Sequence, residues 1–209
     1  MPRESWVWYY GSSYNPYPRA RLRRAVPRPE YTALFEDKEV ADLLCRGVGL
    51  PQPRLLGILE PDADYRAELP AMVARAGLAA AIVKPVGGAA GRGIVVFESA
   101  DGHHRLRGSG AAGDLASFEL GSRAVVQEIL KPDPALADLA VGALSTVRVV
   151  TYLTRDRRLL ILGATMRFGV RGSIIDNWSA GGIAGGVDAL TGRLAETGFD
   201  KRGRRHGAH

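Results

Sequence analysis

Residues 82–97 read IVKPVGGAAGRGIVVF, and this stretch limits the possible folds more than any other part of the chain. Two apolar runs rich in valine and isoleucine, a composition typical of β-strands, flank a loop dominated by glycine. Glycine has no Cβ atom, so the loop can turn sharply and its backbone can approach another molecule closely. The glycines are Gly87, Gly88, Gly91 and Gly93. The stretch predicts two neighbouring strands joined by this loop, with Lys84 at its base.

Two interpretations of the glycine loop stay open at this point. The loop can be a tight hairpin in which the glycines only supply turn geometry. It can also be a flap whose successive backbone N–H groups bind phosphate oxygens, with Lys84 as an additional cation. A Walker loop and a Rossmann fingerprint are excluded, because Gly-Lys-Ser/Thr is missing and a strand rather than a helix follows the loop.

The composition is that of a globular chain large enough for one large domain or two small lobes. It has 209 residues, of which 46% are hydrophobic. No apolar run approaches the ~20 residues that a membrane-spanning helix needs. The aromatic start SWVWYY does not resemble a secretory signal. We therefore expect no membrane span and a cytoplasmic location.

The positive charge lies at the two ends of the chain. The net charge is +6 overall, +4 over residues 1–30 and +3 over residues 200–209, which leaves −1 for residues 31–199. Terminal arginines are usually solvated, so this distribution disfavours nucleic acid as a partner, although a basic nucleic-acid-binding protein stays an alternative. We expect an extended basic arm (1–30), a folded domain (31–199) and a disordered basic tail (200–209).

The periodicity of apolar residues predicts short helices followed by mostly antiparallel strands, which indicates the α+β class. Helices are expected within 30–51 and 65–78, the second with its proline near the start. Strands are expected at 53–59, 79–85, 93–99, 103–108 (as an edge strand), 124–130, 145–154, 156–169 and within 172–194. The strands at 145–154 and 156–169 read as the two arms of one hairpin.

Three further polar signals interrupt apolar segments. Gln127 and Glu128 stand together in AVVQEIL, where burial without hydrogen-bond partners would cost roughly 1–3 kcal/mol each. Arg148 and Arg167 lie in apolar strands, where an arginine either faces solvent or meets an anion. The loop DNWSAGG places Asn177 before two glycines, which suits contact with a charged ligand but equally an Asx-type turn.

Taken in order, these motifs resemble the ATP-grasp superfamily, and more narrowly the sugar-transfer-associated ATP-grasp proteins, often labelled α-L-glutamate ligase-related. The narrower resemblance is carried by STVRVVT, MRFG, SIIDNWSAGGI and GGVDALTGRL. It spans about residues 30–196. It implies an ATP-grasp fold that holds the nucleotide between two α+β lobes, and it favours the flap interpretation of the glycine loop.

The resemblance also implies roles for individual residues. Lys38 and Lys84 would contact the ATP phosphates, and the segment Gln127, Glu128, Ile129 and Leu130 would bind adenine through Glu128 and backbone groups. The flap would consist of Gly87, Gly88, Gly91 and Gly93. Arg148 and Arg167 would face the phosphates or an acyl phosphate, with Asn177 near the phosphate and acceptor site.

The chemistry implied is ATP-dependent and Mg²⁺-dependent ligation of an unidentified carboxylate to an amine or similar nucleophile, in modification of a cell-surface polysaccharide or peptide. Two features depart from the pattern. Ser145 stands where asparagine is usual, and no Glu-x-Asn pair follows residue 190, so the metal ligands stay unassigned. The sequence therefore predicts a C-terminally incomplete domain with weak or no ligase activity; the alternative is a non-catalytic nucleotide-binding or partner-binding module.

Overall fold

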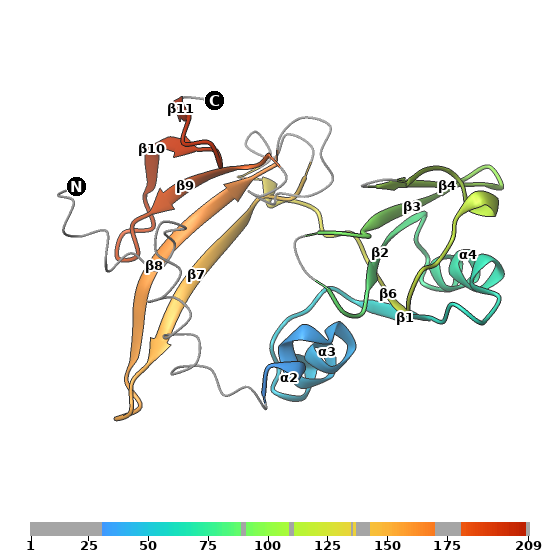
Figure 1. Cartoon of the computed structure of the whole chain (residues 1–209), viewed down its shortest axis with the longest axis horizontal. Coiled ribbons are helices and arrows are strands. Elements are labelled where there is room, and N and C mark those ends of the chain that lie inside the picture. Colours follow the sequence, from blue (N-terminus) through green and yellow to red (C-terminus); the bar gives the residue numbers. More distant parts are fainter. Residues whose placement is uncertain are drawn as a thin grey trace. The chain divides into compact units, whose positions relative to one another are not determined.

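The computed structural model describes residues 31–88, 91–108, 111–134, 136, 143–169 and 181–207 (Figure 1). The chain divides into two compact units, Met1–Gln52 and Pro53–His209. The boundary expected at residue 30 therefore falls inside the first unit.

The described part of the first unit consists of the helices α2 (Ala33–Glu36) and α3 (Lys38–Gly47). The carboxylate of Asp37 caps α3 by accepting hydrogen bonds from the backbone N–H groups of Glu39, at 2.9 Å, and Val40, at 3.0 Å. The helix ends just before Gly49, whose φ of +74° stops further helical winding. The helix and the glycine stop expected within 30–51 are confirmed.

The second unit begins with an antiparallel six-stranded sheet in the order β1-β6-β2-β3-β4-β5. Its elements are β1 (Leu55–Leu59), β2 (Ala80–Pro85), β3 (Val95–Ala100), β4 (His103–Gly108), β5 (Ala111–Asp114), the 3-10 helix Leu115–Ser117 and β6 (Ala124–Gln127). The expectation that 103–108 forms an edge strand is wrong, because β5 pairs with its outer side. The short, small-residue sequence AAGD carries little strand propensity, which is why the sequence concealed β5.

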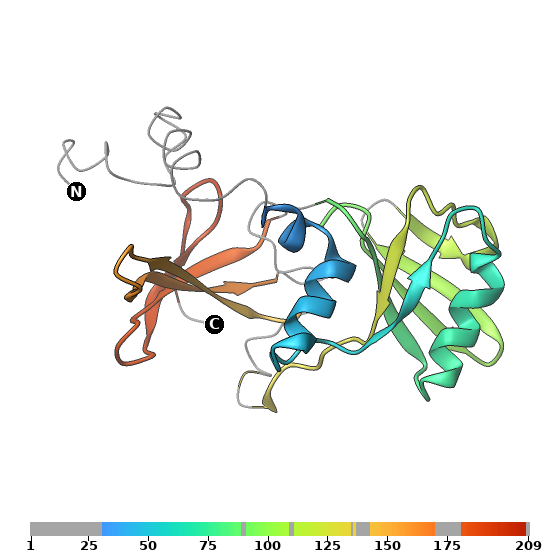
Figure 2. The same cartoon turned by 90° about the horizontal axis from the view of Figure 1, so that it is seen from below.

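Helix α4 (Tyr65–Arg75) covers one face of this sheet (Figure 2). Leu69 and Val73 of the helix are fully buried in one cluster with Val83, Phe97 and other strand residues, which forms the hydrophobic core. The proline expected near the helix start lies further inside, as Pro70 in the second turn. No helix among the described residues is long and apolar enough to cross a membrane.

A second antiparallel sheet in the same unit has five strands in the order β11-β10-β9-β8-β7. Its strands are β7 (Thr146–Leu153), β8 (Leu159–Phe168), β9 (Ile183–Val187), β10 (Leu194–Phe199) and β11 (Arg205–Gly207). The predicted hairpin of 145–154 and 156–169 is confirmed as β7 and β8. Two antiparallel sheets with a few helices confirm the α+β class.

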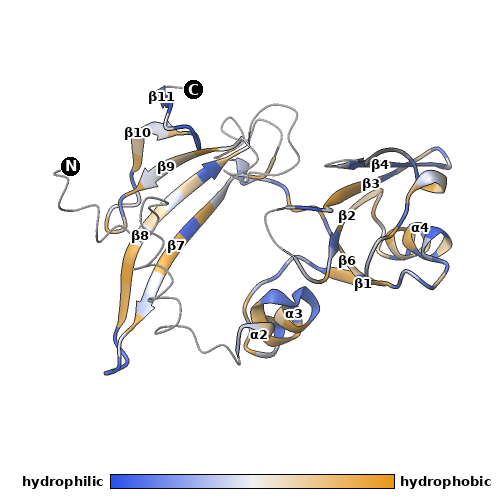
Figure 3. Ribbon diagram, viewed as in Figure 1, coloured by the Kyte–Doolittle hydropathy of each residue, from blue (hydrophilic) through white to orange (hydrophobic). Residues whose placement is uncertain are grey.

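The β7–β8 hairpin is rich in hydrophobic residues (Figure 3), and many of their side chains are exposed. β9 pairs with β8 only over residues 164–168, so among the described strands the outer half of β8 has β7 as its only neighbour. Leu159 and Leu162 are 65% and 64% exposed, and Val147 is 54% exposed. This ribbon presents apolar residues on both faces, which is unusual for a surface hairpin.

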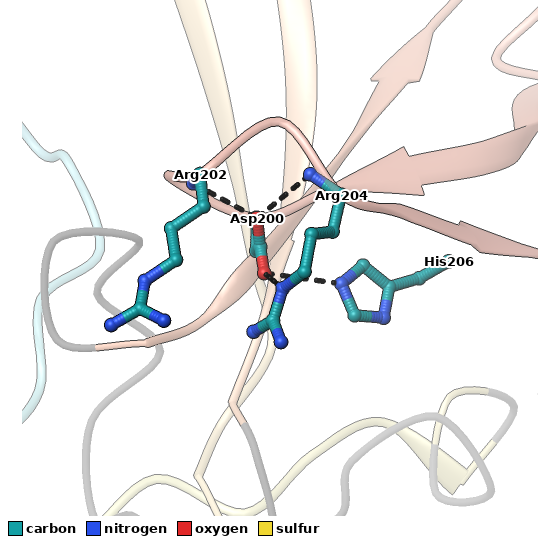
Figure 4. A network of polar contacts seen from close by, with 4 residues as sticks. All are labelled: Asp200, Arg202, Arg204 and His206. Carbon is teal, nitrogen blue, oxygen red and sulfur yellow. Dashed lines mark hydrogen bonds and ion pairs between the residues drawn. The ribbon is translucent and has the colours of Figure 1, made fainter.

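Residues 200–207 form a turn and a strand, so the expectation of a disordered tail at 200–209 is wrong for this part (Figure 4). Asp200 is buried, and its carboxylate accepts hydrogen bonds from the backbone N–H groups of Arg202, at 2.9 Å, and Arg204, at 3.0 Å. Nε of Arg204 lies 2.6 Å from the second carboxylate oxygen. This one carboxylate organises the turn that returns the chain as β11. Residues 208 and 209 lie outside the described part.

Candidate functional site

The first sheet has one face against α4 and an opposite face that forms the floor of a pocket. Along β2, Ala81 and Val83 belong to the core, so the alternating positions Ile82 and Lys84 lie on the other face. The pocket has a volume of about 390 Å³. Its floor is formed by Ile82, Lys84, Val96, Glu98 and Arg107, and its wall by residues 128–132 with Ala143 and Leu144.

Lys84 is half-buried on the pocket floor and is held by Gln127 of β6. Its Nζ donates a hydrogen bond of 2.9 Å to Oε1 of Gln127. β2 and β6 are antiparallel neighbours, with Ile82 opposite Gln127 and Lys84 opposite Val125. The register therefore brings together two predicted site residues that are 43 positions apart in the chain.

The segment after β6 is anchored to the chain just before β1. The N–H of Glu128 donates to the carbonyl oxygen of Arg54 at 3.0 Å, and the N–H of Arg54 donates to Oε1 of Glu128 at 2.9 Å. Ile129 and Leu130 follow, line the pocket and are 42% and 46% exposed. One carboxylate oxygen of Glu128, the residue predicted to bind adenine, thus accepts a hydrogen bond from within the protein. The next two residues form a partly exposed apolar wall of the pocket.

The glycine loop connects β2 and β3, as the sequence predicts. Gly88, Gly91 and Gly93 have φ values of +100°, +76° and +70°, which residues with a Cβ rarely adopt. A Cβ on Gly93 would also lie 2.9 Å from Cγ of Pro85, whereas one on Gly87 would meet open space. Three of the four predicted flap glycines are therefore required by the backbone conformation; whether the loop covers phosphates stays a prediction.

Arg148 and Arg167 lie on one face of the second sheet. Arg148 of β7 is opposite Thr165, and Arg167 of β8 is opposite Thr146, so the two arginines are diagonal neighbours. Arg167 is half-buried and donates to the hydroxyl of Thr146 from Nε at 3.1 Å and from Nη2 at 2.6 Å. Arg148 is exposed. The register thus places both cations on the same face of the second sheet, and their role in ligand binding stays a prediction.

The structure tests neither of the remaining two predicted site residues, Lys38 and Asn177. Lys38 is the first residue of α3 in the first unit. Partial burial lowers the pKa of its ammonium group, and the neighbouring Asp37 carboxylate acts in the opposite direction. Asn177 lies outside the described residues. The roles of both in nucleotide binding stay predictions from the resemblance.

Within the described residues, no group of three or more His, Cys, Asp or Glu side chains could hold a metal ion. Asp188 caps its own turn, since Oδ1 accepts from the N–H groups of Leu190 and Thr191, and these bonds lower its pKa. Asp200 is occupied by Arg204. Both carboxylates therefore serve as caps of their own turns, and the metal ligands stay unassigned.

Sequence reasoning missed two basic residues at the pocket, Arg107 and Lys131. Arg107 is opposite Val96 in the β3–β4 pair, and its Nη2 lies 2.9 Å from Oε1 of Glu98. Alternation along HHRLRG could have shown that Arg107 shares a face with Arg105, away from the core residue Leu106. That this face belongs to the pocket follows only from the pairing of β3 with β2.

A family model described as sugar-transfer associated ATP-grasp matches residues 17–209, and the chain belongs to this family. The match begins inside the segment 1–30 that the sequence suggested as an arm, so residues 17–30 are part of the family domain. No curated protein and no solved structure shows significant similarity to the chain. ATP-grasp domains in general bind ATP, and the α+β architecture of two antiparallel sheets is consistent with that fold.

Proposed function

We propose that this chain binds ATP in the pocket beside Lys84. The observation that carries the proposal is a half-buried lysine on the floor of a pocket of about 390 Å³, in a chain of the ATP-grasp family. Pockets for small molecules usually measure about 300–1,000 Å³ and combine apolar walls with a few polar groups. This pocket has both, in Val96, Ile129 and Leu130 on one hand and Lys84 and Arg107 on the other.

The wall formed by residues 128–132 is the proposed site of the adenine base. Ile129 and Leu130 offer apolar contact beyond the end of β6, where the backbone has left the sheet ladder. Since Oε1 of Glu128 accepts from Arg54, base recognition is assigned to the backbone of this segment and to the second carboxylate oxygen of Glu128. Adenine presents both a donor and an acceptor on its edge, which suits such a mixed set.

The phosphates are assigned to Lys84 and to the loop that follows it. Backbone N–H groups at Gly87, Gly88, Gly91 and Gly93 can approach an anion because no Cβ atoms stand in the way. Arg148 and Arg167 supply two further cations for phosphate or acyl phosphate on the second sheet. Lys38 and Asn177 complete the set that the resemblance implies.

We further propose that the reaction is a ligation in which a carboxylate attacks the γ-phosphate of ATP. ADP leaves, and the resulting acyl phosphate reacts with an amine, which forms an amide bond and releases phosphate. The residues named above would act by positioning the reactants and neutralising charge. Among the described residues no group of three or more metal-ligating side chains occurs, so the ligands of Mg²⁺ stay unassigned. The family description names an association with sugar transfer, and the proposed setting is the modification of a cell-surface polysaccharide or peptide.

Calorimetric titration with ATP tests the binding proposal. Lys84→Ala should weaken ATP binding by at least about tenfold, because a half-buried cation facing phosphate is worth more than about 1.4 kcal/mol. Lys201→Ala is the matched control, since Lys201 is exposed on the β10–β11 turn. Equal ATP affinities of the wild type and Lys84→Ala would refute the assignment of Lys84 to the phosphates. A folded wild type that binds no ATP would refute the proposed ATP binding itself.

The ligase proposal has a separate test, the release of ADP from ATP by the purified chain. The chain would be incubated with Mg²⁺, ATP and a panel of carboxylate and amine compounds. Release that depends on one carboxylate and falls in Arg167→Ala supports ligation. If ATP binds but no tested carboxylate promotes ADP release, the ligase assignment fails for those substrates while nucleotide binding stands.

A further inference from the structure

Gln127 is buried beneath the pocket, against the floor residue Lys84, with only 7% of its surface exposed. It is the last residue of β6 and lies opposite Ile82, so its side chain shares the pocket face with Lys84. The contact between the two is direct, because Nζ of Lys84 donates to Oε1 of Gln127 at 2.9 Å. The oxygen end of this buried amide is therefore engaged by the lysine.

The chemical identity of this acceptor matters for an anion site. An amide oxygen is neutral, so it orients the ammonium group of Lys84 without cancelling its charge. A carboxylate at the same place would form an ion pair with Lys84 and would also repel phosphate. Glutamine and glutamate have nearly the same shape, so the difference between them at this position is electrostatic.

We propose that Gln127 is a positioning residue that holds the Lys84 ammonium toward phosphate while leaving its charge intact. This assigns Gln127 to the phosphate end of the pocket, whereas the sequence suggested a place in base recognition. The inference rests on the proposed binding of ATP. It implies that Gln127 controls affinity for the phosphate chain and has little influence on affinity for the nucleoside.

Gln127→Leu and Gln127→Glu, titrated with ATP and with adenosine, provide the test. Leucine removes the acceptor at similar volume and should weaken ATP binding severalfold. Glutamate should weaken ATP binding by at least about tenfold, because its carboxylate would form an ion pair with Lys84, and an ion pair is stronger than a neutral hydrogen bond. Both variants should bind adenosine within about twofold of the wild type, because adenosine carries no phosphate. Thermal unfolding of each variant establishes that it is folded.

A double-mutant cycle separates positioning from a general effect on the pocket. In a Lys84→Ala background, Gln127→Leu should cause no further loss of ATP affinity, because the group it positions is gone. As a readout without nucleotide, Gln127→Leu should speed acylation of Lys84 by an amine-reactive reagent, measured by mass spectrometry with Lys201 as internal reference.

The outcomes distinguish this inference from the function on which it rests. If the wild type fails to bind ATP, the proposed function itself is refuted. If the wild type binds ATP and Lys84→Ala does not, but Gln127→Leu matches the wild type in affinity and in Lys84 labelling, the positioning role is overturned. Equal losses of ATP and adenosine in the Gln127 variants would also overturn it and return Gln127 to base recognition.

Discussion

The guanidinium group of Arg167 donates two hydrogen bonds to the hydroxyl oxygen of Thr146, at 3.1 and 2.6 Å, across the β7–β8 pair. The two residues are directly opposite in register, and Arg148 lies two positions further along the same face. A guanidinium held through two N–H groups keeps one orientation. The direction in which Arg167 presents its charge therefore depends on a neutral hydroxyl from the neighbouring strand.

Thr146→Val should lower stability and ATP affinity together. Valine keeps the β-branched shape but removes the acceptor of Arg167, so we expect a loss of about 1 kcal/mol in the free energy of unfolding. Urea denaturation measures this loss, and calorimetry measures the weaker binding of ATP. Thr151→Val on the exposed part of β7 is the control and should change neither quantity. Identical behaviour of the two variants would contradict the role given to Thr146.

Gly93→Ala should destabilise the protein, whereas Gly87→Ala should not. The φ of Gly93 is +70° and a Cβ there would lie 2.9 Å from Cγ of Pro85. The left-handed conformation alone costs a residue with a Cβ about 1–2 kcal/mol. Gly87 has open space and no positive φ, so alanine is tolerated there. Chemical denaturation of both variants makes the comparison, and equal stabilities would show that the loop does not require glycine at 93.

Asp200→Asn should be destabilising in a manner that depends on pH. Burial raises the pKa of the Asp200 carboxyl, but hydrogen bonds from Arg204, Arg202 and His206 outweigh it and bring the pKa to about 2. A folded-state pKa below the unfolded value means that the contribution is complete above about pH 4 and lost as the pH falls toward 2. The variant should therefore unfold at lower urea than the wild type at neutral pH.

The difference in urea midpoint between the wild type and Asp200→Asn should shrink between pH 4 and pH 2, the interval set by the ordinary pKa of 3.8 and the folded value of about 2. Asp62→Asn, at an exposed position, is the control and should follow the wild type at every pH. A midpoint difference that stays constant down to pH 2 would mean that the Asp200 charge contributes nothing to the turn.

Leu162→Lys should alter surface properties with little effect on stability. Leu162 is 64% exposed, so the free energy of unfolding should change by less than about 0.5 kcal/mol. Binding of a hydrophobic dye should fall, because the substitution interrupts the apolar surface of the β7–β8 ribbon. Leu69→Ala is the contrasting variant: Leu69 is fully buried, and its truncation should cost about 2–5 kcal/mol. A large loss of stability in Leu162→Lys would show that this surface is covered in solution.

Local sequence signals were sufficient for several elements. The helical spacing of apolar residues and a glycine stop mark α3, and the β-branched runs around 146–168 mark the β7–β8 hairpin. The glycine loop was recognisable because strand-forming runs flank it on both sides. Each of these signals depends on residues close together in the chain, so no knowledge of distant partners was needed.

The strands β5 and β11 were not predicted, because contacts with other segments and not their own residues determine them. β5 has small residues with little strand preference and exists because β4 offers it a pairing edge. The sequence of β11 is typical of a charged tail. The Asp200 carboxylate, however, accepts hydrogen bonds from the N–H groups of Arg202 and Arg204, and the resulting turn lets β11 pair with β10. In both cases tertiary pairing prevails over weak intrinsic propensity.

By itself, the sequence determined the α+β class, the principal strands and the residue types of the candidate site. Only the tertiary structure decided which of those residues meet. Pairing of β6 with β2 takes Gln127 to Lys84, while the anchoring of Glu128 at Arg54 turns the next residues into the pocket wall. The physical reason is that the local sequence of a strand determines which side chains share a face. Which strands become its neighbours, and in which register, depends on contacts between segments that are distant in the chain.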